Sequence, residues 1–183
     1  MLRYLPNLIT GLRFLLVLPI VSAFLKEDWR LAFYLFLIAS LSDGIDGLLA
    51  RCYGWITPLG AMLDPIADKL LLISSFVTFS WLSKLPWWLT GTVIARDLWI
   101  IVGALVYRFW IGPLYCQPIW VSKLNTALQL LLILLLLIHL GFYALPLSSL
   151  YSTGVLMLIT SVVSFVQYTW LWSLQAWRAA CER

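Results

Sequence analysis

The chain has 183 residues, of which 63% are hydrophobic and 11% are charged, and its formal net charge is +4. A soluble domain carries about a quarter charged residues, so this composition excludes an ordinary soluble protein and predicts an integral membrane protein. The basic residues are scattered singly, which argues against a nucleic-acid partner. The three cysteines, Cys52, Cys116 and Cys181, have no spacing typical of a metal or redox site.

Six apolar segments follow one another along the chain, each close to the ~20 residues that a membrane-spanning helix needs. The first has a basic start but no clear cleavage site, so we interpret it as a retained helix and not as a signal peptide. Charged residues, proline or glycine separate the segments. The sequence therefore predicts an all-α membrane protein with six transmembrane helices in a single domain, residues 1–183. The expected helices lie at about 7–25, 31–50, 58–82, 87–108, 122–145 and 149–175.

Lysine and arginine are more frequent at one set of predicted helix ends than at the other, which predicts the orientation in the membrane. The outer loops would hold Lys26, Arg30 and Lys84. We therefore expect a protein of the bacterial inner (cell) membrane with both termini in the cytoplasm. The longest break, at about 109–121, is rich in aromatic residues and proline and is expected to lie along the interface. The inner ends would hold Arg3, Arg51, Arg108, Lys123, Arg178 and Arg183.

Two aspartates lie on one helical face in each of the second and third segments, because residues three, four, seven or eight positions apart share a face. Small residues extend each face toward the cytoplasmic end. At ~1.5 Å per residue, the aspartates lie about 6–7 Å and 12 Å above Arg51 or Gly60. The four carboxylates are therefore expected to converge near the cytoplasmic end of the bundle. The faces consist of Asp43, Asp46, Gly47 and Ala50 in the second segment and of Gly60, Asp64 and Asp68 in the third.

Four unpaired carboxylates at this depth would each cost on the order of 3 kcal/mol or more. Hard divalent cations bound through carboxylate oxygens remove this cost, and two ions bridged by shared carboxylates are the natural arrangement. Small residues beside such ions, with Arg51 at the mouth of the groove, suit a diphosphate. The sequence thus predicts a metal-dependent active site at the cytoplasmic end of the helices.

Salt bridges and helix packing are alternative roles for these residues. The carboxylates could instead pair with Arg13, Lys69 or Arg96, and the small residues could serve close contact between helices. Intramembrane acids also mark ion paths, so a cation transporter is a distant alternative, although the four acids share one depth and do not cross the bilayer. A purely structural membrane subunit would leave the aspartate spacing unexplained.

Residues 43–68 read D-x-x-D-G-x-x-A-R-x8-G-x3-D-x3-D, and this pattern resembles the signature of the CDP-alcohol phosphatidyltransferases. The resemblance implies a six-helix, commonly homodimeric enzyme that binds CDP-diacylglycerol at the cytoplasmic face. It transfers the phosphatidyl group to an alcohol and releases CMP. The resemblance also implies that Asp68 is the general base. By the same resemblance, Asp43, Asp46, Asp64 and Asp68 would bind two Mg²⁺ or Mn²⁺ ions, and Asp43, Gly47, Ala50, Arg51 and Gly60 would bind CDP-diacylglycerol.

A second polar stretch, "VSKLNTALQ" at residues 121–129, opens the fifth segment. Ser122, Asn125 or Thr126, and Gln129 share one face there, with Lys123 beside them. Ser122 and Lys123 are alternatively a helix cap and a membrane anchor. For Arg96, an aspartate of the cluster is expected to be a better partner than Asp97, because adjacent helical residues do not face each other. The predicted acceptor pocket consists of Arg96, Arg108, Ser122, Lys123 and Asn125.

The acceptor alcohol is predicted from one position of this stretch. Within the family, phosphatidylglycerophosphate synthases resemble the chain in the opening "PNLITGLR", but their fifth helix usually opens G-K-x-K-T. Here Ser122 and Asn125 replace the glycine and the second lysine. "SKLNTALQ" and "ARDLWI" are more similar to eukaryotic-type cardiolipin synthases, whose acceptor is phosphatidylglycerol. A diester carries one negative charge and glycerol 3-phosphate nearly two, so we favour phosphatidylglycerol and keep glycerol 3-phosphate as the alternative.

Overall fold

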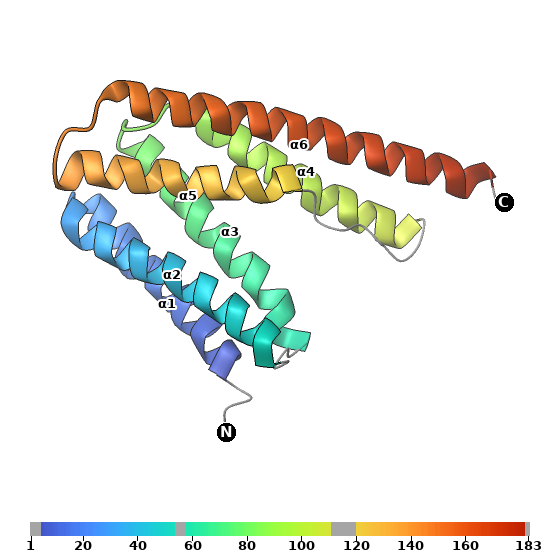
Figure 1. Cartoon of the computed structure of the whole chain (residues 1–183), viewed down its shortest axis with the longest axis horizontal. Coiled ribbons are helices and arrows are strands. Elements are labelled where there is room, and N and C mark those ends of the chain that lie inside the picture. The colour runs from blue at the N-terminus through green and yellow to red at the C-terminus, as the bar shows by residue number, and fades with distance from the viewer. Residues whose placement is uncertain (1–4, 54–57, 111–119, 182–183) are drawn as a thin grey trace.

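The computed structural model describes the backbone of residues 5–53, 58–110 and 120–181, and the side chains of residues 15–42, 69–103, 106 and 120–173. Throughout this part the regular structure is helical, and six helices follow one another as predicted (Figure 1). Their ends lie within a few residues of the expected ones, except that the last helix extends six residues further. The helices are α1 Leu5–Leu25, α2 Trp29–Tyr53, α3 Pro58–Trp81, α4 Trp87–Trp110, α5 Trp120–Gly141 and α6 Leu147–Cys181.

Short turns with local hydrogen bonds end and begin these helices. Glu27 and Ser83 have positive φ angles of 55° and 57°, which reverse the chain after α1 and after α3. The Asp28 carboxylate accepts a hydrogen bond from the Leu31 amide at 3.2 Å and so caps the start of α2. Pro86 and Pro146 directly precede α4 and α6, where proline costs no helical hydrogen bond. These turns explain why the predicted ends were nearly correct.

The helices run up and down, so that successive turns alternate between two ends of the molecule. The α1–α2, α3–α4 and α5–α6 turns gather at the left of Figure 1, whereas the N-terminus and the C-terminus lie away from that end. α1 packs against α2 and α3, and α6 packs against α4 and α5. α5 also contacts α2 and α3 and so joins the two groups of helices.

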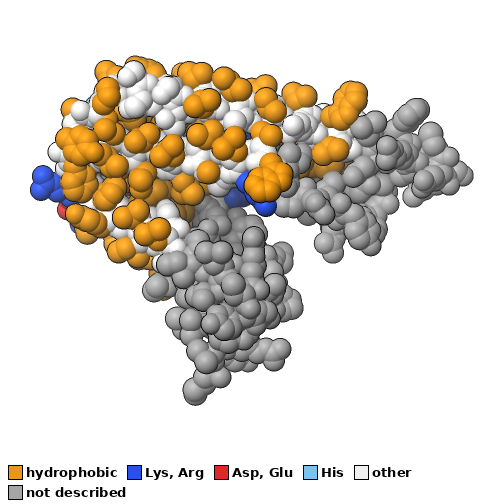
Figure 2. Space-filling model, in the orientation of Figure 1, with side chains coloured by type: hydrophobic (Ala, Val, Ile, Leu, Met, Phe, Trp, Pro, Cys, Tyr) orange, Lys and Arg blue, Asp and Glu red, His pale blue; other side chains and the backbone are white. Residues whose placement is uncertain are grey.

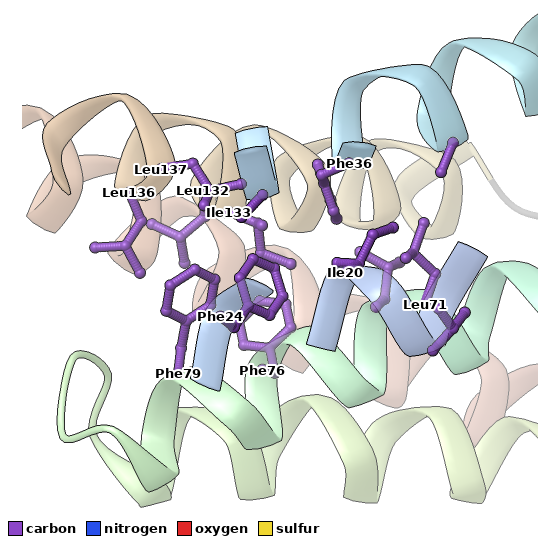
Figure 3. Close-up of a cluster of buried hydrophobic side chains, with 14 of the residues drawn as sticks. Ile20, Phe24, Phe36, Leu71, Phe76, Phe79, Leu132, Ile133, Leu136 and Leu137 are labelled. Atoms are coloured by element: carbon purple, nitrogen blue, oxygen red, sulfur yellow. The ribbon is translucent and has the colours of Figure 1, made fainter. Parts of the chain in front are cut away.

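A core of aliphatic and aromatic side chains lies where α1, α2, α3 and α5 meet (Figure 3). Phe24, Phe36, Phe76 and Phe79 are fully buried there. The rings of Phe24 and Phe79 have centroids 4.7 Å apart, close enough for a favourable aromatic contact. This core fixes α3 against α1, and therefore fixes the helix that carries Asp64 and Asp68.

The outer surface is strongly apolar over the face shown in Figure 2, where charged side chains show at the left end and beside the grey atoms near the centre. Among the described stretches, two helices are long and apolar enough to cross a membrane, Trp120–Gly141 and Leu147–Ser173. Shorter apolar stretches lie in α1, α2 and α3, at Leu15–Leu25, Trp29–Ser42 and Lys69–Trp81. Six helices are thus present, but within the described stretches only α5 and α6 meet this criterion for a membrane span.

Candidate active site

The two aspartate pairs fall on two consecutive helices. Asp43 and Asp46 lie in the last half of α2, and Asp64 and Asp68 lie in the first half of α3. Both helices are continuous through these positions, so the spacing that places each pair on one helical face holds for the backbone. The connection between α2 and α3 is only four residues, 54–57. Because each residue spans at most ~3.6 Å, this short connection keeps the aspartate-bearing ends of the two helices close to each other.

The side chains of residues 43–68 lie outside the described part of the structure. The convergence of the four carboxylates, and the contacts of Gly47, Ala50, Arg51 and Gly60, therefore stay predictions. The donor set itself fits divalent cations, because carboxylate oxygens are the ligands that Mg²⁺ and Mn²⁺ prefer. If the carboxylates lie on the helical faces that the sequence spacing predicts, these four aspartates would hold the ions.

Beside α3, a buried polar network joins α4, α5 and α6. Arg96 is its centre and is only 5% exposed. Its Nη1 donates to the Asp97 carboxylate at 2.7 Å, and its Nη2 donates to the hydroxyls of Ser122 and Ser164 at 2.6 and 2.8 Å. One arginine side chain thus connects all three helices. The predicted neighbours Arg96 and Ser122 are brought together.

The expectation that Asp97 would be a poor partner for Arg96 is wrong. The Cβ atoms of adjacent helical residues do point about 100° apart, but the arginine side chain is long and flexible enough to curl back over its own helix. Asp97 is 3% exposed, and a buried carboxylate needs a charged or hydrogen-bonded partner. The cost of leaving either charge unpaired explains why the pair forms in spite of the geometry.

Asn125 lies one turn beyond Ser122 and is completely buried. Its Oδ1 accepts hydrogen bonds from the Thr160 and Ser161 hydroxyls of α6 at 2.9 and 2.8 Å. Gln129, on the same face, is also buried. The predicted common face of α5 is therefore confirmed, and it points into the protein.

Lys123 has a different environment from Asn125. It is exposed, and its ammonium group lies 5.2 Å from the centroid of the Trp120 ring. The side chain of Arg108, which the sequence also assigns to the acceptor pocket, lies outside the described part. Of the five predicted acceptor residues, the structure brings Arg96 and Ser122 into contact and places Asn125 in the adjoining layer.

Three buried N–H groups of this network have no hydrogen-bond partner among the described residues: Nε of Arg96, Nδ2 of Asn125 and Nε2 of Gln129. A buried donor without a partner costs about 1–3 kcal/mol, so such groups usually meet water or a ligand. All three belong to α4 and α5, and Asn125 and Gln129 are one helical turn apart. The unmet donors make this region suitable for a ligand that supplies oxygen atoms.

Lys69 of α3 lies near the Arg96 network. It directly follows Asp68 in the sequence and is half-buried, and its ammonium group lies within range of the charges of Asp97 and Arg96. The α3 backbone at Asp68 therefore lies beside the Arg96 network.

Sequence reasoning missed the contribution of α6 to this network. Thr160, Ser161 and Ser164 donate to or accept from predicted pocket residues. The available signal was the i, i+3 and i, i+4 spacing of these hydroxyls on an otherwise apolar helix. That spacing alone does not reveal which helix the hydroxyls face.

A family model for CDP-alcohol phosphatidyltransferase matches residues 3–172. A probable phosphatidylglycerophosphate synthase of Mycobacterium tuberculosis is 41% identical over 118 residues, covering 64% of this chain and 51% of that protein. A human cardiolipin synthase (CMP-forming) is 31% identical over 146 residues, covering 70% and 48% of the two chains. A CDP-diacylglycerol–glycerol-3-phosphate 3-phosphatidyltransferase of Pseudomonas fluorescens is 37% identical over 147 residues, covering 72% and 71%.

The chain spans about half the length of the first two of these relatives. The family match nevertheless extends over all six helices except the end of α6. It includes both aspartate pairs and the Arg96 network. The chain belongs to the CDP-alcohol phosphatidyltransferase family.

Proposed function

We propose that this protein transfers the phosphatidyl group of CDP-diacylglycerol to an alcohol, with release of CMP, in the synthesis of an anionic phospholipid. The observation that carries the proposal is the complete pattern of residues 43–68, whose two halves fall on α2 and α3 within the family match. The names of the relatives, which include CMP-forming cardiolipin synthases, support it.

Two Mg²⁺ or Mn²⁺ ions would be held by the four aspartates of the pattern, Asp43, Asp46, Asp64 and Asp68. When bound, the ions would neutralise the diphosphate and the charge that develops on the leaving CMP. Arg51 adds a positive charge for the nucleotide diphosphate. The small residues Gly47, Ala50 and Gly60 leave room for the substrate against the two helices.

Asp68 is proposed as the general base. Its carboxylate takes the proton from the acceptor hydroxyl, whose oxygen forms a bond to the phosphorus of the phosphatidyl group. The bond from that phosphorus to the oxygen of CMP breaks, and CMP leaves with the electron pair. Positioning of the two substrates supplies much of the remaining acceleration, as in other phosphoryl transfers.

Phosphatidylglycerol is the acceptor that the described side chains favour, which makes the protein a cardiolipin synthase. The charge of Arg96 is compensated by Asp97 at 2.7 Å. Asn125 is neutral, buried and bonded to α6. This part of the pocket therefore has little excess positive charge, which suits a diester with one negative charge better than glycerol 3-phosphate with nearly two. Lys123 and Arg108 would supply the remaining attraction.

Glycerol 3-phosphate is the second candidate acceptor, because a specific observation favours it. The relatives that are 41% and 37% identical have names that describe phosphatidylglycerophosphate synthesis, whereas the human cardiolipin synthase is 31% identical. In this case the phosphate of glycerol 3-phosphate would have to be bound by Lys123, Arg108 and Lys69, without a second lysine at position 125.

We further propose that all six helices cross the bilayer of a bacterial inner (cell) membrane, in a single domain over residues 1–183. Both termini and the active site then face the cytoplasm. The apolar outer surface and the alternation of turns between two ends of the bundle support this placement. A homodimer is the expected assembly, on the basis of the family resemblance alone.

The proposal is tested by purifying the protein in detergent with Mg²⁺ or Mn²⁺ and supplying CDP-diacylglycerol. Parallel reactions receive phosphatidylglycerol or glycerol 3-phosphate, and CMP release and the lipid product are measured. Cardiolipin formed only with phosphatidylglycerol is the expected result, and EDTA should abolish it. Phosphatidylglycerophosphate from glycerol 3-phosphate would show that the acceptor assignment is wrong. No CMP release with either acceptor would contradict the proposed activity.

A further inference from the structure

A groove runs along the line where α4 and α6 meet, and its outer part lies at the end of the molecule opposite to the aspartates. Its outer part has a volume of about 380 Å³ and lies beside the α3–α4 turn and the start of α6, with Leu132 and Leu136 of α5 as its floor. Its inner part, of about 440 Å³, lies along Gly91 and reaches Arg96. Trp88 lines both parts and therefore lies at the boundary between them.

The walls of the groove are apolar and leave room for a chain-like ligand. Tyr151, Val155 and Val162 are more than half exposed and follow one another along the groove side of α6. A Cβ atom added at Gly91 or Gly154 would meet no other atom of the described structure within 4 Å. Both parts fall within the ~300–1,000 Å³ range of small-molecule sites.

The outer end of the groove carries positive charge. Lys84 is exposed there, and none of the described residues that line the groove is acidic. The N-terminal ends of α4 and α6 also lie at this end, at Trp87 and Leu147. Each helix start presents partial positive charge and free amide groups. An apolar groove with a cationic outer end is complementary to an amphiphile with a negatively charged head.

We propose that this groove binds a phospholipid with an anionic headgroup. The phosphate lies at Lys84 and the two helix starts, and one acyl chain lies along α4 and α6 past Trp88. The distance along α3 from Asp68 to Trp81 is about 20 Å, so the headgroup lies far from the aspartates. The inner part of the groove reaches Arg96 of the predicted acceptor pocket. The proposal rests on the membrane placement described above and not on the catalytic roles.

Such a lipid would belong to the outer leaflet, because Lys84 lies in an outer loop when both termini are cytoplasmic. It would fill the space between α4, α5 and α6 that the side chains leave open. Since these three helices also carry the Arg96 network, an occupied groove stabilises the same helices that form the acceptor pocket.

Photo-cross-linking in vesicles tests the proposal. The full chain, with benzoylphenylalanine in place of Tyr151, is reconstituted in phosphatidylcholine vesicles with or without phosphatidylglycerol, and the cross-linked lipid is identified by mass spectrometry. We expect phosphatidylglycerol to cross-link about fivefold more efficiently than phosphatidylcholine at equal content, the effect of one lysine near an anionic headgroup. Lys84→Gln should reduce this preference severalfold, and only the contribution of the two helix starts should remain.

Two further variants test the groove itself. Gly154→Phe fills the outer part and Gly91→Leu fills the inner part, and both should remove most of the cross-linking to either lipid. Ile159→Phe, on an exposed position of α6 that does not line the groove, is the matched control and should leave the yield unchanged. Thermal unfolding verifies that each variant is folded. Unchanged cross-linking in both filled variants, or equal yields of the two lipids in the parent protein, would overturn the proposal.

Discussion

Arg96 and Asp97 form the buried ion pair on which the network between α4, α5 and α6 is built. The pair is joined at 2.7 Å, and both side chains are about 5% exposed. The remaining hydrogen bonds of Arg96 go to Ser122 and Ser164, so this residue holds the start of α5 in place. Its charge is compensated locally, and its Nε–H has no partner among the described residues and is free to donate to a ligand.

Removing one partner of this pair should be more harmful than removing both. Asp97→Leu leaves an uncompensated buried guanidinium and should lower the free energy of unfolding by about 3–5 kcal/mol. The double variant Arg96→Leu/Asp97→Leu should recover a large part of this loss, because it leaves no unpaired charge. Thermal unfolding in detergent measures both effects. A double variant less stable than Asp97→Leu would contradict the assigned pairing.

Asp68→Asn should abolish transfer and leave CDP-diacylglycerol binding intact. An amide cannot take the proton of the acceptor hydroxyl, and loss of a general base costs about 10²–10⁴-fold in rate. CMP release measures the rate, and equilibrium binding of CDP-diacylglycerol is the control for folding. Activity above a tenth of the parent level would contradict the role of Asp68 as the base.

Asn125→Lys should shift the acceptor preference toward glycerol 3-phosphate. The added ammonium group is placed in a buried position between α5 and α6, where a doubly charged phosphate is the ligand that compensates it best. The ratio of the rates with glycerol 3-phosphate and phosphatidylglycerol is the measurement. Asn125→Leu is the matched control, because it removes the amide without adding charge. An unchanged ratio in Asn125→Lys would show that position 125 does not select the acceptor.

At the scale of helices, the contact between α4 and α6 depends on a small residue. The ring of Trp172 on α6 occupies the space that a side chain at Gly103 would need. One turn before Gly103 on α4, the Trp99 indole donates to Thr169 at 3.1 Å and packs against Phe165. These contacts hold the two helices together on the inner side of the groove.

Gly103→Ala should therefore destabilise the protein although alanine is the better helix former. Overpacking of this kind costs typically about 1–3 kcal/mol. Gly91→Ala on the same helix is the matched control, because its added Cβ meets no neighbour in the described structure, and it should stabilise the helix by about 0.5–1 kcal/mol. Trp172→Leu should relieve the effect at Gly103. Equal effects of the two alanine substitutions on thermal unfolding would contradict this packing.

At the scale of the whole molecule, the proposed orientation places all three native cysteines on the cytoplasmic side. Cys52 lies near the end of α2, Cys116 between α4 and α5, and Cys181 at the end of α6. A membrane-impermeant maleimide should thus leave the native chain unlabelled in intact cells and label it after permeabilisation. Lys84→Cys should add a label in intact cells. Labelling of the native chain without permeabilisation would reverse the proposed orientation.

The sequence by itself determined the number, order and approximate ends of the helices, because apolar runs and the charged residues, prolines and glycines between them are local features. It also determined the family, because the aspartate pattern of α2 and α3 is defined by the number of residues between its fixed positions. The common face of Ser122, Asn125 and Gln129 was predictable for the same reason. These features depend on residues close together in the chain.

Only the tertiary structure decided which helical faces meet. The pairing of Arg96 with Ser164, and of Asn125 with Thr160 and Ser161, depends on the packing of α6 against α4 and α5. These partners are up to 68 residues apart in the sequence. The cost of burying an unpaired polar group arises only after the helices have assembled, so local spacing does not indicate which partner removes it. The groove along α4 and α6 could not be predicted for the same reason, because it is the space that remains unfilled after the side chains of the helices have packed.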